Sequence, residues 1–141
     1  MNTEQYFLDS NILIALMDSA DVHHKRAKEI FLKINQTSGQ IFLSDLVINE
    51  VLSVFAKRCE SRNKPGNFKI LASKFQKAAQ NYPILCLYAL LPANYKKIIS
   101  LMIKSQGHLN FHDSLIVLFL RSVTKVKLIS FDQDFADLSV Y

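Results

Sequence analysis

Four acidic residues lie in stretches of the sequence that are otherwise apolar, and they are the first candidates for chemistry. Asp9 lies between Tyr-Phe-Leu and Ser-Asn-Ile-Leu-Ile, and Glu50 lies within Leu-Val-Ile-Asn-Glu-Val-Leu. Asp113 precedes Ser-Leu-Ile-Val-Leu-Phe-Leu, and Asp132 follows Leu-Ile-Ser-Phe. Sequence of this kind is destined for burial, and a buried carboxylate is costly unless it is paired or binds a cation. These acids are therefore unlike ordinary solvated surface charges.

A shared metal ion is the simplest way to compensate these acids, because few basic residues lie near them in the sequence. Oxygen ligands without His or Cys at matching positions suit Mg²⁺ or Mn²⁺. Clustered carboxylates that bind such ions are a recurrent solution for phosphodiester hydrolysis, since the ion activates water and neutralises charge on the leaving oxygen. The acids together predict a metal-dependent phosphodiesterase site.

Each acid also has a purely structural interpretation. Asp9 fits a turn at the end of a strand, and Glu50 fits the exposed side of a helix. Asp113 fits a helix cap that accepts backbone N–H bonds, a role that is compatible with metal binding. Asp132 and Asp134 both stand where a fourth acid is expected, and the pattern of apolar neighbours leaves that choice open.

The elements that must position these acids alternate between short apolar runs and longer helical ones. We predict β-strands at residues 6–9, 40–44, 82–90 and 127–131. We predict helices at residues 11–17, 22–34, 46–58, 68–81, 92–105 and 111–123, with Asp45 as the N-cap of the third. This alternation is typical of a mostly parallel sheet covered by helices. Ligands bind beyond the carboxyl ends of such strands, which is where the acids fall.

Composition limits the class of protein. The 141 residues fit one domain, half of them are hydrophobic, and the net charge of +5 with a pI of about 9.3 favours an anionic partner such as nucleic acid. The sequence shows no membrane-spanning run and no secretory signal, so we expect a cytoplasmic protein. Cys59 and Cys86 are expected to be unpaired thiols, with Cys86 in the core.

Other polar groups have bland interpretations. His23 and His24 are expected on a solvated helix start. Basic residues gather around the central turn and its flanking helices, where solvation and RNA backbone contact are equally good interpretations. These residues are Lys57, Arg58, Arg62, Lys64, Lys69, Lys74 and Lys77.

Four short stretches, taken together and in order, resemble the PIN-domain family and its VapC-like toxins of toxin–antitoxin pairs. They are Leu8-Asp9-Ser10-Asn11, Asn49-Glu50, His112-Asp113-Ser114 and Ser130-Phe131-Asp132-Gln133-Asp134-Phe135. The resemblance implies an α/β, PIN-like three-layer fold over residues 1–141, with a parallel sheet of four to five strands flanked by helices. It also implies a Mg²⁺- or Mn²⁺-dependent endoribonuclease with an RNA substrate, a cognate antitoxin and a homodimeric state.

The same resemblance assigns roles to individual residues. Asp9 and Asp113 match the principal metal ligands, while Glu50 and Asp132 complete the catalytic cluster. The Ser-x-Asp pattern selects Asp132 over Asp134 as the fourth acid. Asn11 and Ser130 match polar positions that support the acids in this family. The chain departs from the family at its last strand, which is reduced to residues 139–141, and at His112, which the family pattern does not require.

Three other functions compete with the toxin. A free-standing PIN protein could process RNA without any antitoxin, and a short neighbouring gene for a DNA-binding antitoxin would separate these two cases. A catalytically silent PIN-like module would have lost its acids, which are all present here. A phosphoaspartate receiver would need a late lysine at a strand end, where this chain has Asp132.

Overall fold

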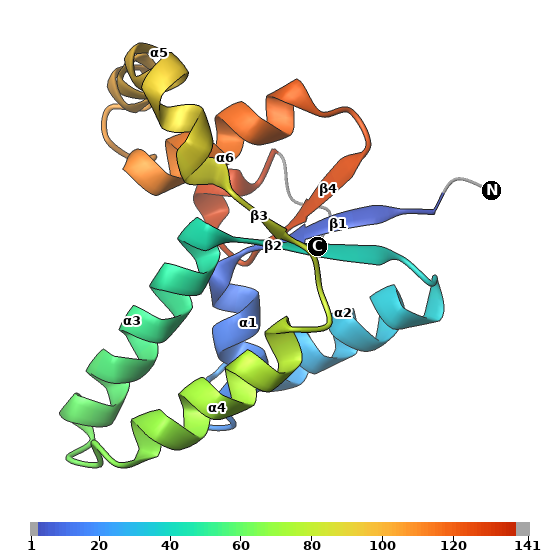
Figure 1. Ribbon diagram of the computed structural model, residues 1–141, viewed down its shortest axis with the longest axis vertical. Coiled ribbons are helices and arrows are strands. Elements are labelled where there is room, and N and C mark those ends of the chain that lie inside the picture. Colours follow the sequence, from blue (N-terminus) through green and yellow to red (C-terminus); the bar gives the residue numbers. More distant parts are fainter. Residues whose placement is uncertain (1–2, 138–141) are drawn as a thin grey trace.

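A parallel sheet forms the centre of the computed structural model, which describes residues 3–137 (Figure 1). Its four strands lie in the order β3-β2-β1-β4. They are β1 (Gln5–Leu8), β2 (Gln40–Ser44), β3 (Ile84–Leu85) and β4 (Val126–Ile129), and every neighbouring pair is parallel. The predicted parallel sheet is confirmed, while the short last strand predicted at 139–141 lies outside the described residues.

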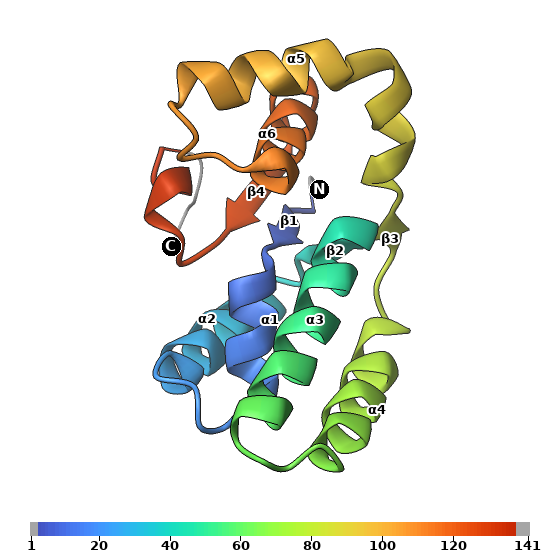
Figure 2. The ribbon, with the colours of Figure 1, turned by 90° about the vertical axis from the view of Figure 1, so that its left-hand side faces the viewer.

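Helices cover both faces of this sheet and give the three layers predicted. They are α1 (Ser10–Met17), α2 (His24–Gln36), α3 (Asp45–Ser61), α4 (Asn67–Ala79), α5 (Leu91–Lys104) and α6 (Phe111–Ser122). The first four lie on one side of the sheet, and α5 crosses α6 on the other (Figures 1 and 2). Two short 3₁₀ helices, η1 (Leu87–Leu90) and η2 (Gln133–Phe135), follow β3 and β4.

The central strand β1 sets the position of the site. Phe7 and Leu8 are fully buried, and Leu8 stands in register with Ile129 of β4. Burying large apolar side chains such as these stabilises the fold by roughly 1.5–3 kcal/mol each. The next residue, Asp9, donates its backbone N–H to the Ile129 carbonyl at 3.0 Å. The hydrophobic ladder thus ends where the polar site begins.

The third strand is much shorter than the predicted run of residues 82–90. Only Ile84 and Leu85 pair with β2, because the chain then turns into η1. Asp45 causes this turn: its carboxylate accepts the backbone N–H groups of Leu87 at 2.9 Å and Tyr88 at 3.1 Å. The prediction of Asp45 as N-cap was wrong as well, since Ser44 caps α3 by accepting from the Val47 N–H at 3.2 Å.

Two smaller predictions also fail for physical reasons. Cys86 is exposed rather than in the core, because it lies where the chain leaves the edge strand, and Cys59 is the buried thiol. His24 is half-buried, with its Nδ1 2.6 Å from the Ala15 carbonyl oxygen, so it ties α2 to α1 instead of facing water.

Within residues 3–137, none of the helices is long and apolar enough to cross a membrane.

Candidate active site

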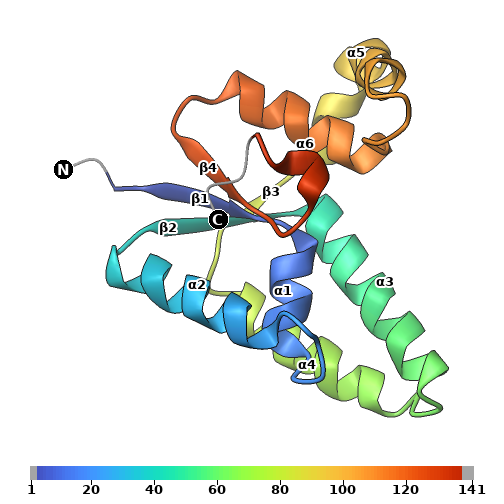
Figure 3. The same ribbon diagram turned by 180° about the vertical axis from the view of Figure 1, so that it is seen from behind.

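One cavity, of about 420 Å³, is lined by all four predicted acids, Asp9, Glu50, Asp113 and Asp132. It lies beyond the carboxyl ends of β1 and β4, as the strand-end argument predicts. Figure 3 shows why these elements meet: α1 and α3 begin at the end of the sheet where η2 lies. The acids come from positions far apart in the chain, so the fold brings them together.

Asp9 is the most buried of the four acids, at 5% exposed. As the N-cap of α1 it accepts the Ser10 N–H on Oδ1 at 2.7 Å. Its Oδ2 accepts the Ser130 hydroxyl at 2.6 Å and the Asn11 amide at 3.2 Å. Burial raises the pKa of Asp9 to about 6; the hydrogen bonds from Ser130 and Ser10 oppose the rise, and the charges of Glu50 and Asp113 add to it.

Asn11 and Ser130 join the segments that follow the neighbouring strands β1 and β4. The Asn11 amide also donates to the Ser130 hydroxyl at 3.1 Å, and its carbonyl accepts the Phe131 N–H at 3.0 Å. The Asp132 N–H donates to the same serine oxygen at 3.0 Å. These bonds fix Asp9 and the backbone of Asp132 relative to each other.

Asp113 is both a helix cap and a member of the cavity. It forms a capping box with Asn110, whose side chain accepts the Asp113 N–H at 2.9 Å while the Asp113 carboxylate accepts the Asn110 N–H at 3.2 Å. Burial raises the pKa of Asp113, the Asn110 hydrogen bond opposes this, and the charges of Asp132, Glu50 and Asp134 raise it further. Asp113 is therefore a helix cap that also lines the cavity, and its predicted role as a metal ligand stays a prediction.

The other two acids have more freedom. Glu50 is exposed on the second turn of α3, and Asp132 is half-buried and caps η2 by accepting the Asp134 N–H at 2.9 Å. Asp134 is exposed and is absent from the cavity lining. The choice of Asp132 as the fourth acid stays a prediction that this placement supports.

The cavity has further polar lining residues that the sequence interpretation missed, namely Asn110, Asp21, His23 and Arg58. The Asn-x-x-Asp spacing before the apolar run of α6 is a capping-box signal that could have revealed Asn110. Arg58 lies eight residues after Glu50 on the same helix, a spacing that could have revealed a shared face. Asp21 and His23 gave no signal, because their positions depend on how α1 joins α2.

The chemistry of the donors fits a hard divalent ion. The described residues supply no ion-pair partner to Asp9, Glu50, Asp113 or Asp132. Their donors are all oxygens, the ligands that Mg²⁺ and Mn²⁺ prefer. However, no three Asp, Glu, His or Cys side chains of residues 3–137 lie close enough to form a ready-made metal site. Binding a cation would need the acids to move closer together, and exposed Glu50 is the one least restrained from doing so.

Comparisons with known proteins bear on the family and the fold of the chain. The family model described as the PIN domain matches residues 6–141. The crystal structure of VapC20 from Mycobacterium tuberculosis, described as a toxin that cleaves the sarcin–ricin loop, superimposes with a TM-score of 0.70. That match covers 94% of each chain at 17% sequence identity, so the likeness is one of fold. No curated protein matches the chain significantly.

Proposed function

Because this chain belongs to the PIN-domain family, we propose that it is a Mg²⁺- or Mn²⁺-dependent endoribonuclease and the toxin of a toxin–antitoxin pair. The observation that carries the proposal is the state of Asp9. It is a buried carboxylate held only by neutral donors, in a cavity that it shares with Glu50, Asp113 and Asp132. A buried charge is costly unless it is paired with an opposite charge or coordinates a metal ion, and no basic side chain of the described residues forms an ion pair with Asp9.

In this proposal Asp9 and Asp113 hold the ion, and Glu50 and Asp132 complete the cluster. When bound, such an ion supplies the Lewis acidity that phosphodiester hydrolysis needs at neutral pH. Ser130 and Asn11 fix the direction of the Asp9 carboxylate, and partners of this kind tune metal sites. The Asn110 N–H does the same for Asp113. We assign to Glu50 and Asp132 the role of orienting the attacking water.

The test of the catalytic part is cleavage of RNA by the purified protein with Mn²⁺ or Mg²⁺, followed by sequencing of the RNA ends. We expect cuts at defined positions that disappear with EDTA and in the Asp9→Asn variant. Cleavage that continues undiminished in EDTA would contradict the proposed chemistry.

The toxin part needs a different test, because a housekeeping PIN nuclease would pass the first one. The fold shared with VapC20, whose description is that of a toxin, supports the toxin role. Expression of the wild type should halt growth of a bacterial host, and expression of Asp9→Asn to the same level should not. Equal growth of both strains would favour an RNA-processing role without an antitoxin.

We further propose a cognate antitoxin and a homodimer as the partners of this chain, both implied by the family resemblance. Co-expression with the product of a short neighbouring gene should restore growth and yield a stable complex. Light scattering on the purified protein should give twice the chain mass of 16.1 kDa.

A further inference from the structure

The active-site cavity extends well beyond the four acids, along one face of α3. Glu50, Val54 and Arg58 all line it, at intervals of four residues that place them on the same side of the helix. Eight residues of α-helix span about 12 Å along the axis. The cavity thus has an acidic end at Glu50 and a second end at Arg58, roughly two helical turns away.

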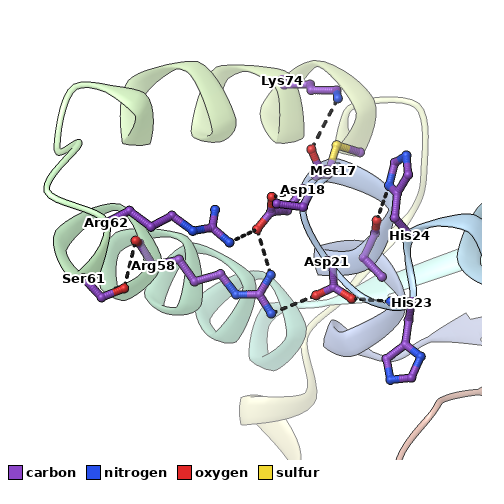
Figure 4. Close-up of polar contacts among 11 residues, drawn as sticks. Met17, Asp18, Asp21, His23, His24, Arg58, Ser61, Arg62 and Lys74 are labelled. Carbon is purple, nitrogen blue, oxygen red and sulfur yellow. Dashed lines mark hydrogen bonds and ion pairs between the residues drawn. The ribbon is translucent and has the colours of Figure 1, made fainter.

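Arg58 is firmly held at this second end. Its two terminal nitrogens each bind a different carboxylate, Asp18 at 2.8 Å and Asp21 at 2.8 Å, which come from the end of α1 and the connection to α2 (Figure 4). These contacts use two of the five N–H donors of a guanidinium. The side chain is still 32% exposed, so it is not closed off from the cavity.

Arg58 is also the only Lys or Arg among the described residues that line the cavity, against five acids, Asp9, Asp21, Glu50, Asp113 and Asp132. Arg62 offers a direct comparison, since it binds the same Asp18 carboxylate at 3.1 Å but does not line the cavity. Arg58 differs in that it also pairs with Asp21, and these two contacts fix it on the cavity wall. Of the two arginines bound to Asp18, only Arg58 can therefore meet a ligand inside the cavity.

We propose that Arg58 binds a backbone phosphate of the RNA strand, one that flanks the phosphate being cleaved. The distance from the acidic end places this contact at a different phosphate from the reacting one. A fixed guanidinium is well suited to a phosphate because its planar fork matches the phosphate oxygens. This inference rests on the proposed function, because it takes RNA as the substrate of the acidic end.

The rim beside Arg58 suits the rest of a nucleotide. Val22 is 91% exposed there, and the exposed ring of His23 lies 4.9 Å from the Phe131 ring. The Arg26 guanidinium lies over the other ring of this pair, 5.1 Å from the Phe131 centroid. Proteins that bind single-stranded RNA stack the bases on aromatic side chains and contact the phosphates with basic ones. The rim beside Arg58 offers both kinds of side chain.

The test compares Arg58→Gln with Arg62→Gln, which each remove one ion pair to Asp18. Arg58→Gln also removes the pair to Asp21, so the comparison is repeated in an Asp21→Asn background, where that carboxylate is absent. On single-stranded RNA that spans the cleaved bond, Arg58→Gln should lower kcat/KM about tenfold, mainly through KM, since a charged hydrogen bond is lost. Arg62→Gln should stay within about twofold. The RNA is then shortened stepwise from each side of the cleaved bond. Shortening from one side should abolish the difference in kcat/KM between wild type and Arg58→Gln, and shortening from the other side should not.

Equilibrium binding separates this inference from the proposed function. In EDTA, the plot of log affinity against log salt should be shallower by about 0.7 for Arg58→Gln and unchanged for Arg62→Gln, because one phosphate contact is lost. Binding in EDTA together with no cleavage in Mn²⁺ or Mg²⁺ by the wild type would contradict the nuclease proposal, yet these slopes would still decide the role of Arg58. Equal slopes in all three proteins, or no RNA binding by the wild type, would overturn the inference.

A further variant covers the case in which Arg58→Gln fails to fold. Asp21→Asn keeps Arg58 but frees one of its terminal N–H groups and removes one negative charge from the cavity. It should bind RNA about threefold more tightly than the wild type and with a steeper salt dependence. Combined with Arg58→Lys, which lacks the planar fork, the gain should vanish. A gain that persists in the double variant would overturn the contact with Arg58.

Discussion

An aspartate lies at each end of helix α1. The two are equally buried, but their carboxylates have opposite kinds of partner, neutral at one end and cationic at the other. Asp9 is the N-cap and Asp18 the C-cap, and each residue is 5% exposed. The Asp9 carboxylate meets a hydroxyl, an amide and a backbone N–H. The Asp18 carboxylate meets two guanidinium groups, those of Arg58 and Arg62.

The consequence is a difference in protonation. Burial raises the pKa of Asp9 to about 6 against the pull of its neutral donors. Burial acts on Asp18 in the same direction, but the hydrogen bonds from Arg58 and Arg62 outweigh it and the pKa of Asp18 is lowered. The helix dipole favours a carboxylate at the N-terminus and opposes one at the C-terminus, which is a further reason why Asp18 needs its cations. An acid left without a cation in the folded protein is the one available to an external ion.

The largest expected effect is on catalysis. Asp9→Asn should lower RNA cleavage by on the order of 10³-fold, because a divalent ion contributes several kcal/mol to such a reaction. Asp18→Asn should leave the rate at 25 °C within about fivefold of the wild type, provided that the protein is folded. The measurement is single-turnover cleavage in Mn²⁺, with circular dichroism as the control for folding. Similar losses in both variants would erase the proposed difference between the two ends of α1.

The pH dependence of stability should show the same contrast in the metal-free protein. Asp9 has a folded-state pKa near 6, above the value of 3.8 for the unfolded chain, so its contribution is favourable at low pH and is lost as the pH rises through 6. At about 1.4 kcal/mol per pH unit, the loss amounts to about 3 kcal/mol. Urea unfolding in EDTA between pH 4 and 7.5 should therefore show a steeper decline for the wild type than for Asp9→Asn.

Asp18 acts with the opposite sign and in a lower window. Its lowered pKa gives stability that is present above the unfolded value of 3.8 and is lost as the pH falls through the folded value. Stability should thus pass through a maximum at mildly acidic pH in EDTA. Wild type and Asp9→Asn that decline in parallel above pH 4 would show that Asp9 carries no unfavourable charge.

The two Asn variants should also shift thermal stability in opposite directions at neutral pH in EDTA. Asp18→Asn should destabilise by about 2 kcal/mol, less than for a fully buried pair because Arg58 and Arg62 are 32% and 43% exposed. Asp9→Asn should stabilise by about 1 kcal/mol, because the relief of the buried charge exceeds the lost hydrogen bonds. Differential scanning calorimetry measures both.

Metal provides the control for that measurement. Millimolar Mn²⁺ should raise the midpoint of the wild type and of Asp18→Asn, because it binds the native state, and should raise that of Asp9→Asn much less. A wild-type midpoint that ignores metal, together with a lower midpoint for Asp9→Asn in EDTA, would make Asp9 a structural acid.

The fold was predictable where local sequence decides it. The strands around Phe7, Phe42 and Leu128 and all six helices follow from short apolar runs and helical periodicity. The length of the third strand was not predictable, because the strand ends where the Asp45 carboxylate accepts backbone N–H groups more than forty residues away in the sequence. Long-range polar contacts of this kind leave no periodic trace in a sequence.

The site also has a part that was predictable from local sequence and a part that was not. The grouping of the four acids was predictable because each one lies in apolar sequence near the end of a strand or in the first two turns of a helix, and the order of parallel elements brings such positions to one edge. Arg58 was one of several basic residues, and only its spacing from Glu50 set it apart. Its place in the cavity depends on Asp18 and Asp21, which the turn between α1 and α2 brings to α3. A contact that requires two loops and a helix to meet cannot be inferred from spacing alone.

The smallest expected effect concerns the neutral donors that distinguish Asp9 from Asp18. Ser130→Ala removes the 2.6 Å hydrogen bond from the hydroxyl to Asp9 and the acceptor for the Asp132 N–H. Arg62→Gln is the matched control, because it removes one of the two ion pairs to Asp18. Loss of the hydroxyl should weaken the affinity for Mn²⁺ about tenfold, since partners that orient a ligand typically contribute a factor of 10 to 100. It should also raise the pKa of Asp9, because that bond opposes the effect of burial. Arg62→Gln should leave the affinity for Mn²⁺ unchanged.

Isothermal titration with Mn²⁺ at neutral pH measures both variants against the wild type. Because a raised pKa makes protons compete with the ion, the deficit of Ser130→Ala should grow as the pH is lowered from 7.5 to 6. A deficit that is independent of pH would mean that Ser130 acts on the geometry of the site alone, and no deficit would mean that Asp9 needs no orienting donor.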